Sequence, residues 1–140
     1  MIRRSLTCSI NNYQANLVSI HSEEEHQFVV GLNGGFPWLG GRRDPGKGNN
    51  FVWSDGTPWD YSNWARGQPD DIAGKEGCAH IWDVNQWNTV YGLWNDAPCS
   101  SETTFVCKKG KNPGDTEFDL EHISYLCSFL RLKLAESVFP

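Results

Sequence analysis

The sequence predicts an α+β fold in which short helices and strands frame a long loop region. A strongly capped helix begins near Ser22, and short extended segments at residues 16–20 and 104–107 precede and follow the loops. Between them, residues 36–101 consist of short apolar pieces separated by Gly, Pro, Asn and Asp. A loop region of this length needs disulfides, buried tryptophans or a metal to hold it.

Composition, charge and the motifs that are missing exclude several classes of function. The chain has 140 residues, of which 39% are hydrophobic and 21% charged, as is typical of one globular domain. Its net charge of −5 offers no attraction to phosphate, so we expect no nucleic-acid binding. No stretch approaches the roughly 18 apolar residues of a membrane span, so we expect no membrane insertion of this segment. Nucleotide-binding and hydrolase motifs are absent from the sequence, and we expect no enzyme activity.

Two elements are expected before the capped helix. Residues 5–14 place Leu6, Ile10 and Tyr13 near helical spacing, which predicts a first helix. Residues 16–20 then predict a short extended segment.

The second helix has a clear start signal. Ser22 and Glu25 form an S-x-x-E capping box, in which each side chain is expected to accept a hydrogen bond from the backbone N–H of the other residue. Acidic residues in the first turn suit the helix dipole, and Asn33-Gly34-Gly35 is expected to end the helix. The buried face is predicted to consist of Phe28, Val29 and Leu32.

The loop region closes on a predicted strand at residues 104–107, and the Lys- and Gly-rich residues 108–114 are typical of a domain edge. We therefore expect a domain at residues 1–109 and a C-terminal tail at residues 110–140. The apolar residues of the tail show both helical spacing and strand-like alternation, so the sequence leaves its order uncertain.

Five cysteines are many for a domain of this size, and they form no C-x-x-C pair or other zinc-like cluster. Disulfides are the better explanation. Because five is odd, one thiol is free, intermolecular or outside the segment that evolved as a unit. Disulfides indicate an oxidising compartment, so we expect an extracellular or cell-surface protein of which these 140 residues, without an export signal, are an incomplete version.

Oxygen-bearing side chains gather between residues 68 and 96. Calcium takes six to eight oxygen ligands, and three carboxylates with two amides supply five of them and a charge of −3. Any one of these residues alone would be interpreted as a turn residue, so the prediction of a Ca²⁺ site depends on the set. Its members are Gln68, Asp70, Glu76, Asn95 and Asp96.

Short motifs, three of which contain these residues, follow one another in a characteristic order and approximate spacing. They are LVSIHSEEE (17–25), WLG (38–40), WSDG (53–56), NW (63–64), QPD (68–70), EGC (76–78), WNDAPC (94–99) and FVC (105–107). On these motifs, residues 8–109 resemble a C-type lectin-like domain. The resemblance implies two helices, small antiparallel sheets and a long calcium-binding loop region, with the first strands of the domain missing from this chain.

The resemblance also implies a disulfide pattern. In this family the first cysteine pairs with the last and the middle two pair together, which corresponds to Cys8–Cys107 and Cys78–Cys99. Cys127 is then the odd thiol.

The same resemblance implies a ligand. The family's sugar-binding calcium ion is held by the residue types found here at Gln68, Asp70, Glu76, Asn95 and Asp96, with Pro69 in the cis form. Gln-Pro-Asp is the family's galactose-type triplet, so the expected partners are glycans with terminal galactose or N-acetylgalactosamine. One shallow site of this kind binds with a Kd on the order of millimolar, so an oligomer would be needed for avidity.

Some positions depart from the family's pattern. Galactose-type members often carry a tryptophan shortly after the triplet, where this chain has Asp71 and Ile72. The alternative function is therefore a module that binds a protein surface or ice, as in the type II antifreeze proteins of this fold. An auxiliary calcium site would depend on Asp44 or Asp71.

The remaining aromatic residues are expected to be structural. His21 and His26 are predicted to lie on the helix surface, whereas the sequence identifies no partner for His80 or His122. Trp82 and Trp87 are expected to lie in the core. The tryptophans expected to form the framework are Trp38, Trp53, Trp59, Trp64 and Trp94.

Overall fold

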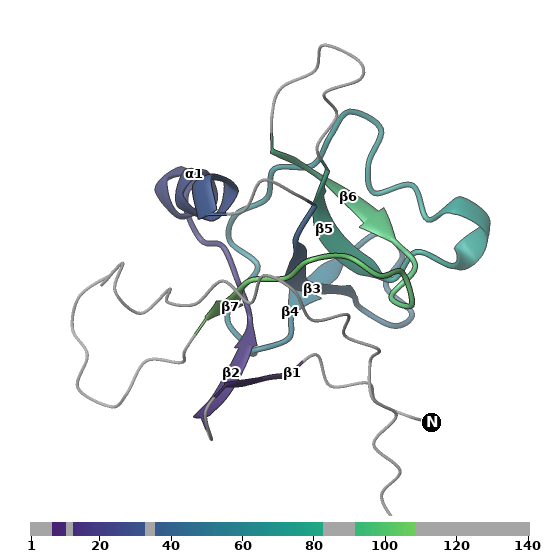
Figure 1. Ribbon diagram of the computed structural model, residues 1–140. Helices are drawn as coiled ribbons and strands as arrows, with labels where there is room; N and C mark the ends of the chain where they lie inside the picture. Colours follow the sequence, from purple (N-terminus) through teal and green to yellow (C-terminus); the bar gives the residue numbers. More distant parts are fainter. Residues whose placement is uncertain (1–6, 11–12, 33–35, 83–91, 109–140) are drawn as a thin grey trace, which may run out of the picture.

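The structure, a computed structural model, describes residues 7–10, 13–32, 36–82 and 92–108. These residues form two antiparallel sheets, one α-helix and one short 3-10 helix, which confirms the α+β fold (Figure 1). One sheet has the strand order β1-β2-β7 and the other β4-β3-β5-β6. The elements are β1 (Thr7–Ile10), β2 (Tyr13–Leu17), α1 (Glu23–Leu32), β3 (Trp38–Arg43), β4 (Phe51–Trp53), η1 (Ile72–Gly74), β5 (Cys78–Trp82), β6 (Leu93–Ala97) and β7 (Cys107–Lys108).

The prediction of a first helix at residues 5–14 is wrong. Within the described ranges α1 is the single α-helix, and β1 and β2 instead form an antiparallel hairpin with Ile10 opposite Tyr13. The β-branched Thr7 and Ile10 and the aromatic Tyr13 favour extended backbone, and the Asn11-Asn12 pair that separates the strands in the sequence is typical of short turns. Apolar residues at near-helical spacing were therefore weaker evidence than local strand and turn preference.

The predicted closing strand joins the end of the domain to its beginning. Cys107 of β7 lies opposite Leu17 of β2, and the Val18 N–H donates to the Val106 carbonyl at 2.9 Å. The two sheets also meet here, because the Gly40 N–H of β3 donates to the Val18 carbonyl at 2.9 Å. A Cβ atom at Gly40 would lie 2.7 Å from the Leu17 carbonyl oxygen, so this approach requires glycine.

Helix α1 begins as the capping box predicts, with one change. The Glu25 N–H donates to Ser22 Oγ at 3.2 Å, but the Glu25 carboxylate accepts from the His21 N–H at 2.5 Å instead of from Ser22. Glu25 is 2% exposed and forms an ion pair with Lys108 Nζ at 2.9 Å. Its carboxylate therefore ties the start of α1 to β7. Of the expected buried face, Val29 is buried, while Phe28 and Leu32 are partly buried and pack on the core.

The prediction that His26 lies on the helix surface is wrong. The side chain is fully buried, with Nδ1 accepting from Trp94 Nε1 at 3.3 Å and Nε2 lying 2.9 Å from the Asn63 amide. The imidazole is buried because it satisfies the indole N–H of a core tryptophan, a role that helical spacing alone does not predict. His21, which precedes α1, is half-buried.

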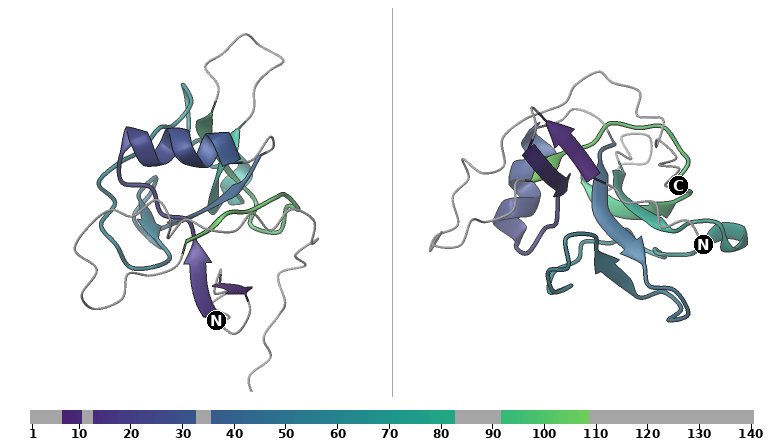
Figure 2. Two further views of the ribbon diagram at one scale, coloured as in Figure 1. Left: turned by 60° about the vertical axis from the view of Figure 1, so that its left-hand side comes forward. Right: turned by 90° about the horizontal axis from the view of Figure 1, so that it is seen from below.

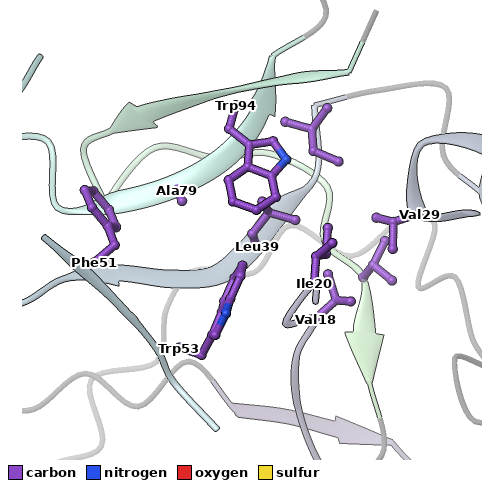
Figure 3. Packing of buried hydrophobic residues seen from close by; sticks show 10 residues of the cluster. Val18, Ile20, Val29, Leu39, Phe51, Trp53, Ala79 and Trp94 are labelled. Atoms are coloured by element: carbon purple, nitrogen blue, oxygen red, sulfur yellow. The ribbon is translucent and has the colours of Figure 1, made fainter. Parts of the chain in front are cut away.

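The main core lies where α1 and the four-stranded sheet meet the chain around Val18 and Ile20 (Figure 3). Trp94 is 0% exposed to solvent and contacts Trp53 edge-on, with 5.8 Å between ring centroids. Trp53 in turn stacks on Trp59 at 4.2 Å. The expected framework role of these tryptophans is confirmed, with Trp64 packing on the same cluster and Trp38 packing against a second one around Leu17 and Phe105.

The long connection between β4 and β5 has one short element, η1, and is held by the core beneath it. The Ala65 N–H donates to the Trp94 carbonyl and the Trp94 N–H to the Asn63 carbonyl, both at 2.8 Å. Figure 1 and the right-hand view of Figure 2 show that η1 lies far from the β1–β2 hairpin. The part of this connection that carries η1 and the β1–β2 hairpin thus occupy different ends of the molecule.

Cys78 and Cys99 form a disulfide, as expected, with their Cα atoms 5.1 Å apart. Cys107 is also disulfide-bonded. Because the side chain of Cys8 lies outside the described part, Cys8–Cys107 stays a prediction, as does the role of Cys127. In the described ranges, none of the helices is both long enough and apolar enough to cross a membrane.

Candidate functional site

Three carboxylates meet beside the four-stranded sheet. Asp70 and Glu76 belong to the connection between β4 and β5, and Asp96 lies on β6 opposite Ala79 of β5. One oxygen atom of each carboxylate lies within 4.8 Å of the other two. Asp96 is fully buried, Glu76 half-buried and Asp70 exposed. Carboxylates this close, at the edge of solvent, can share one cation.

Hydrogen bonds from the loop backbone hold this arrangement. Asp96 Oδ1 accepts from the Asp70 N–H at 3.1 Å, and its Oδ2 accepts from the Asp71 N–H at 2.9 Å. Glu76 Oε2 accepts from the Ile72 N–H at 2.9 Å, while the Glu76 N–H donates to Asp71 Oδ1 at 3.0 Å. The Asp71 backbone is left-handed, with φ 48°, which Asp tolerates better than most residues. The carboxylates therefore shape the loop that carries them.

Gln68 stands next to this cluster in the sequence, and its peptide bond to Pro69 is cis, as expected. Its Oε1 atom is buried and has no hydrogen-bond partner within the described part of the chain. A buried amide oxygen without a donor costs about 1–3 kcal/mol. A cation bound by the neighbouring carboxylates is one way to satisfy it.

Asn95 is adjacent to Asp96, but its amide is engaged elsewhere. Successive residues of a strand point to opposite faces, and Asn95 lies opposite His80 of β5, with Nδ2 3.0 Å from His80 Nε2. Burial lowers the pKa of His80 to about 4, so this imidazole is neutral at pH 7. The structure thus gathers Asp70, Glu76 and Asp96 into one cluster and places the Asn95 amide against His80.

The electrostatics of the cluster favour a cation. Burial raises the pKa of the Glu76 carboxyl, although the Ile72 N–H that it accepts opposes this shift. Its hydrogen bond with Asp70 and the negative charges of Asp70 and Asp96 raise the pKa further. Together with the unpartnered oxygen of Gln68, this donor set fits Ca²⁺, which prefers oxygen ligands.

Two neighbours of the cluster were not expected to take part in this site. Arg43 Nη2 lies 2.5 Å from Asp96 Oδ2, and Asp71 holds the backbone of Glu76. Arg43 had no sequence signal, because the register that brings β3 alongside β5 is a long-range property. Asp44, suggested with Asp71 as a residue on which an auxiliary calcium site would depend, pairs with Lys47 at 2.9 Å, and that site stays a prediction.

A cavity of about 370 Å³ lies beside the β3–β4 hairpin. Asn49 contributes to its wall and donates from Nδ2 to the Pro69 carbonyl at 3.2 Å, so the hairpin contacts the Gln-Pro-Asp triplet. The residues that line the cavity are partly polar and partly aromatic: Asp44, Lys47, Asn49, Asn50, Phe51, Trp59 and Trp64.

Ser19, His21 and Asp60 have the connectivity of a hydrolase triad. His21 Nδ1 lies 2.6 Å from Asp60 Oδ1, and His21 Nε2 lies 3.2 Å from Ser19 Oγ. However, Ser19 is 1% exposed and its hydroxyl donates to Asp55 Oδ2 at 2.6 Å. Its oxygen cannot reach a substrate, so we interpret this network as structural.

Ile72 occupies the place after the triplet where a tryptophan was missing. It is 63% exposed, and its backbone N–H is bonded to Glu76, so an apolar side chain stands next to the carboxylate cluster. Trp82 is half-buried on β5, which agrees only in part with a core position. Trp87 and His122 lie outside the described residues.

Comparison with known proteins identifies the family of this chain. The family model of the Lectin C-type domain matches residues 4–109. A lectin from Pleurodeles waltl is 39% identical over 100 residues, which cover 67% of this chain and 55% of that protein. The versican core protein of Rattus norvegicus is 39% identical over 98 residues, or 69% of this chain and 3% of versican. The chain therefore spans about half of the first relative and a small part of the second.

Solved structures show the same fold. The C-type lectin CEL-I from Cucumaria echinata has a TM-score of 0.57 at 28% identity, covering 74% of this chain and 76% of CEL-I. A calcium-independent type II antifreeze protein also has a TM-score of 0.57, at 32% identity and 66% coverage of both chains. With its sheets, its loop region and a family match over most of its length, the chain belongs to the C-type lectin domain family.

Proposed function

We propose that this domain binds Ca²⁺ and, through it, a terminal galactose or N-acetylgalactosamine unit of a glycan, without chemistry on the sugar. The observation that supports this most directly is the gathering of Asp70, Glu76 and Asp96 within 4.8 Å, with Asp70 two residues along the sequence from Gln68 and its buried, unpartnered side-chain oxygen. The residues that would hold the ion are Gln68, Asp70, Glu76, Asn95 and Asp96. Asn95 would join them through Oδ1, since its contact with His80 is made by Nδ2.

The bound ion would supply a positive centre for two neighbouring sugar hydroxyls. Each hydroxyl can also donate to a carboxylate of the site and accept from an amide N–H. In this chain the amide belongs to Gln68 and the carboxylate to Asp70, on either side of the cis Pro69. The order of amide and acid supports galactose over mannose, because exchanging them would reverse the donor and acceptor sides of the pair.

Titration of the protein with galactose and with mannose, in calcium and in EDTA, tests the proposal. We expect weak galactose binding, with a Kd on the order of millimolar, that disappears in EDTA. Asp70→Asn should abolish it, while Asp60→Asn, an exposed acid bonded to His21, should leave it intact. Equal binding in EDTA, or a preference for mannose, would contradict the proposal.

A second candidate function is binding of a protein surface or ice. The exposed Ile72 beside the cluster and the fold shared with a calcium-independent type II antifreeze protein favour it. In that case galactose would not compete for the ligand even in saturating calcium. Thermal hysteresis of the solution would identify ice as the ligand.

We also propose an extracellular location and a domain boundary near residue 109. The Cys78–Cys99 disulfide supports the first, because disulfides persist in oxidising compartments. The end of the family match supports the second. Absence of enzyme activity, absence of nucleic-acid binding and oligomerisation for avidity stay predictions.

A further inference from the structure

We propose that Arg43 is a positioning residue that holds the loops of the calcium site in their binding arrangement before the ion arrives. This inference deepens the proposed function and rests on it. Arg43 is the last residue of β3, and its side chain is only 15% exposed. A guanidinium so far from solvent needs acceptors on all its edges.

The guanidinium reaches three separate segments. Nη2 donates to Asp96 Oδ2 on β6 at 2.5 Å, and Nε donates to the Glu76 carbonyl at 3.1 Å. Nη1 donates to Asn49 Oδ1 at 2.7 Å and to the Gly48 carbonyl at 3.0 Å. One side chain therefore joins the hairpin between β3 and β4, the loop before β5 and strand β6.

The connection continues into the sugar-binding triplet. Asn49, held through its oxygen by Arg43, donates from Nδ2 to the Pro69 carbonyl at 3.2 Å. The Arg43 backbone N–H donates to the Gly77 carbonyl at 2.9 Å, and its guanidinium carbon lies 5.0 Å from the centroid of the Phe51 ring. Both ends of the residue are thus fixed by neighbours.

The chemistry explains why an arginine suits this position. Asp96 is fully buried, and a buried carboxylate requires a partner of opposite charge. Arg43 donates to Oδ2, which also accepts from the Asp71 N–H, while Oδ1 accepts from the Asp70 N–H. The planar fork of arginine makes several directed bonds at once, which the single ammonium group of lysine cannot reproduce.

Two effects of Arg43 on calcium would have opposite signs. As a positive charge near the ion, it would weaken calcium binding, and its removal would tighten it. As a positioning residue, it would keep the loops competent, and its removal would raise the calcium Kd by the inverse of the competent fraction. Positioning dominates, because the hydrogen bonds of Arg43 join the β3–β4 hairpin, the loop before β5 and strand β6 at once.

Calcium titration of the full chain by calorimetry separates these effects. Arg43→Gln removes both the positive charge and the planar guanidinium, whereas Arg43→Lys keeps the charge but loses the guanidinium. Arg42→Ala is the control, because it changes an exposed neighbour on the same strand. We expect both Arg43 variants to bind Ca²⁺ about tenfold more weakly, as a competent fraction of about a tenth would give. Arg42→Ala should bind like the wild type. Tighter or unchanged binding by Arg43→Gln would overturn the proposal.

Limited proteolysis in EDTA provides a readout that does not depend on binding. Both Arg43 variants should be cleaved faster than the wild type within residues 44–50 or 66–77, and saturating calcium should reduce the difference. Equal cleavage in EDTA would overturn the proposal. If Arg43→Gln does not fold, Arg43→Lys decides. If the wild type binds no calcium, the proposed function fails, while cleavage in EDTA still tests the positioning role.

Discussion

The aromatic core and the carboxylate cluster are neighbours that are held together in different ways. Trp94 on β6 packs against the rings of Trp53, Trp59 and Tyr61, with centroids 5.7 to 5.9 Å apart. Two residues along the same strand, Asp96 is also fully buried, but its neighbours are backbone N–H groups and a guanidinium. One strand therefore serves both a region stabilised by burial of apolar surface and a region of concentrated negative charge.

Because of this difference, we expect substitutions in the core to change stability and substitutions in the cluster to change calcium binding. Apolar burial contributes free energy with or without an ion. In the cluster, Arg43 compensates the charge of Asp96, but the carboxylates still repel one another, and a bound metal cation would relieve that repulsion. Calcium should therefore matter to the cluster and little to the core.

Removal of the central tryptophan should have the largest effect. We expect Trp94→Ala to lower the free energy of unfolding by about 3–5 kcal/mol, because it leaves a cavity among several rings and removes the donor to His26 Nδ1. Urea unfolding in EDTA and in calcium should show the same loss. Phe36→Ala, at a side chain 41% exposed, should cost less than about 0.5 kcal/mol and serves as control. Full rescue of Trp94→Ala by calcium would break the comparison.

The core should also respond to pH through His26. Burial lowers the pKa of His26, although the charge of Glu23 on the same helix opposes this. The unfolded chain, with a pKa near 6.5, therefore binds more protons than the folded one below that pH. Stability should be complete above about pH 6.5 and decrease as the pH falls through the window beneath it.

His26→Gln supplies the matched control for this measurement, since glutamine can accept from Trp94 Nε1 but does not titrate. The difference in unfolding free energy between wild type and variant should change with pH between about 7 and 5. Parallel pH profiles of the two proteins would show that His26 is not responsible. His80, whose pKa is about 4, contributes equally to both profiles and cancels.

In the carboxylate cluster, a substitution should change calcium affinity more than stability. Glu76→Gln keeps an oxygen that can accept from the Ile72 N–H but removes one of three crowded charges. We expect unchanged or slightly higher stability in EDTA, and calcium affinity lower by on the order of tenfold, because affinity depends on the charge of the ligands. Thermal melts in EDTA check the expected stability, and calcium calorimetry on the same samples checks the expected loss of affinity. A loss of stability in EDTA would mean that the cluster supports the fold without an ion.

In both regions the sequence predicts the features that depend on local signals and misses those that depend on long-range packing. The capped helix, the framework tryptophans and the three clustered acids were predicted, because motifs and local signals carry them. The β1–β2 hairpin was missed, since three apolar residues such as Leu6, Ile10 and Tyr13 fit a helix as well as a strand. Buried His26 and the contacts of Arg43 depend on long-range packing and sheet register, which no local pattern reports.

The smallest expected effect lies at the rim of the cluster. Ile72 is 63% exposed and contributes little to the core, so Ile72→Trp should leave the unfolding free energy within about 0.5 kcal/mol of wild type. A flat indole at this place can pack on the apolar face of a galactose ring, where the smaller isoleucine covers less area. If the sugar binds beside Asp70 and Glu76, galactose affinity should rise several-fold and stay dependent on calcium, as titration would show. Tighter binding without calcium would instead indicate an apolar surface that acts independently of the carboxylates.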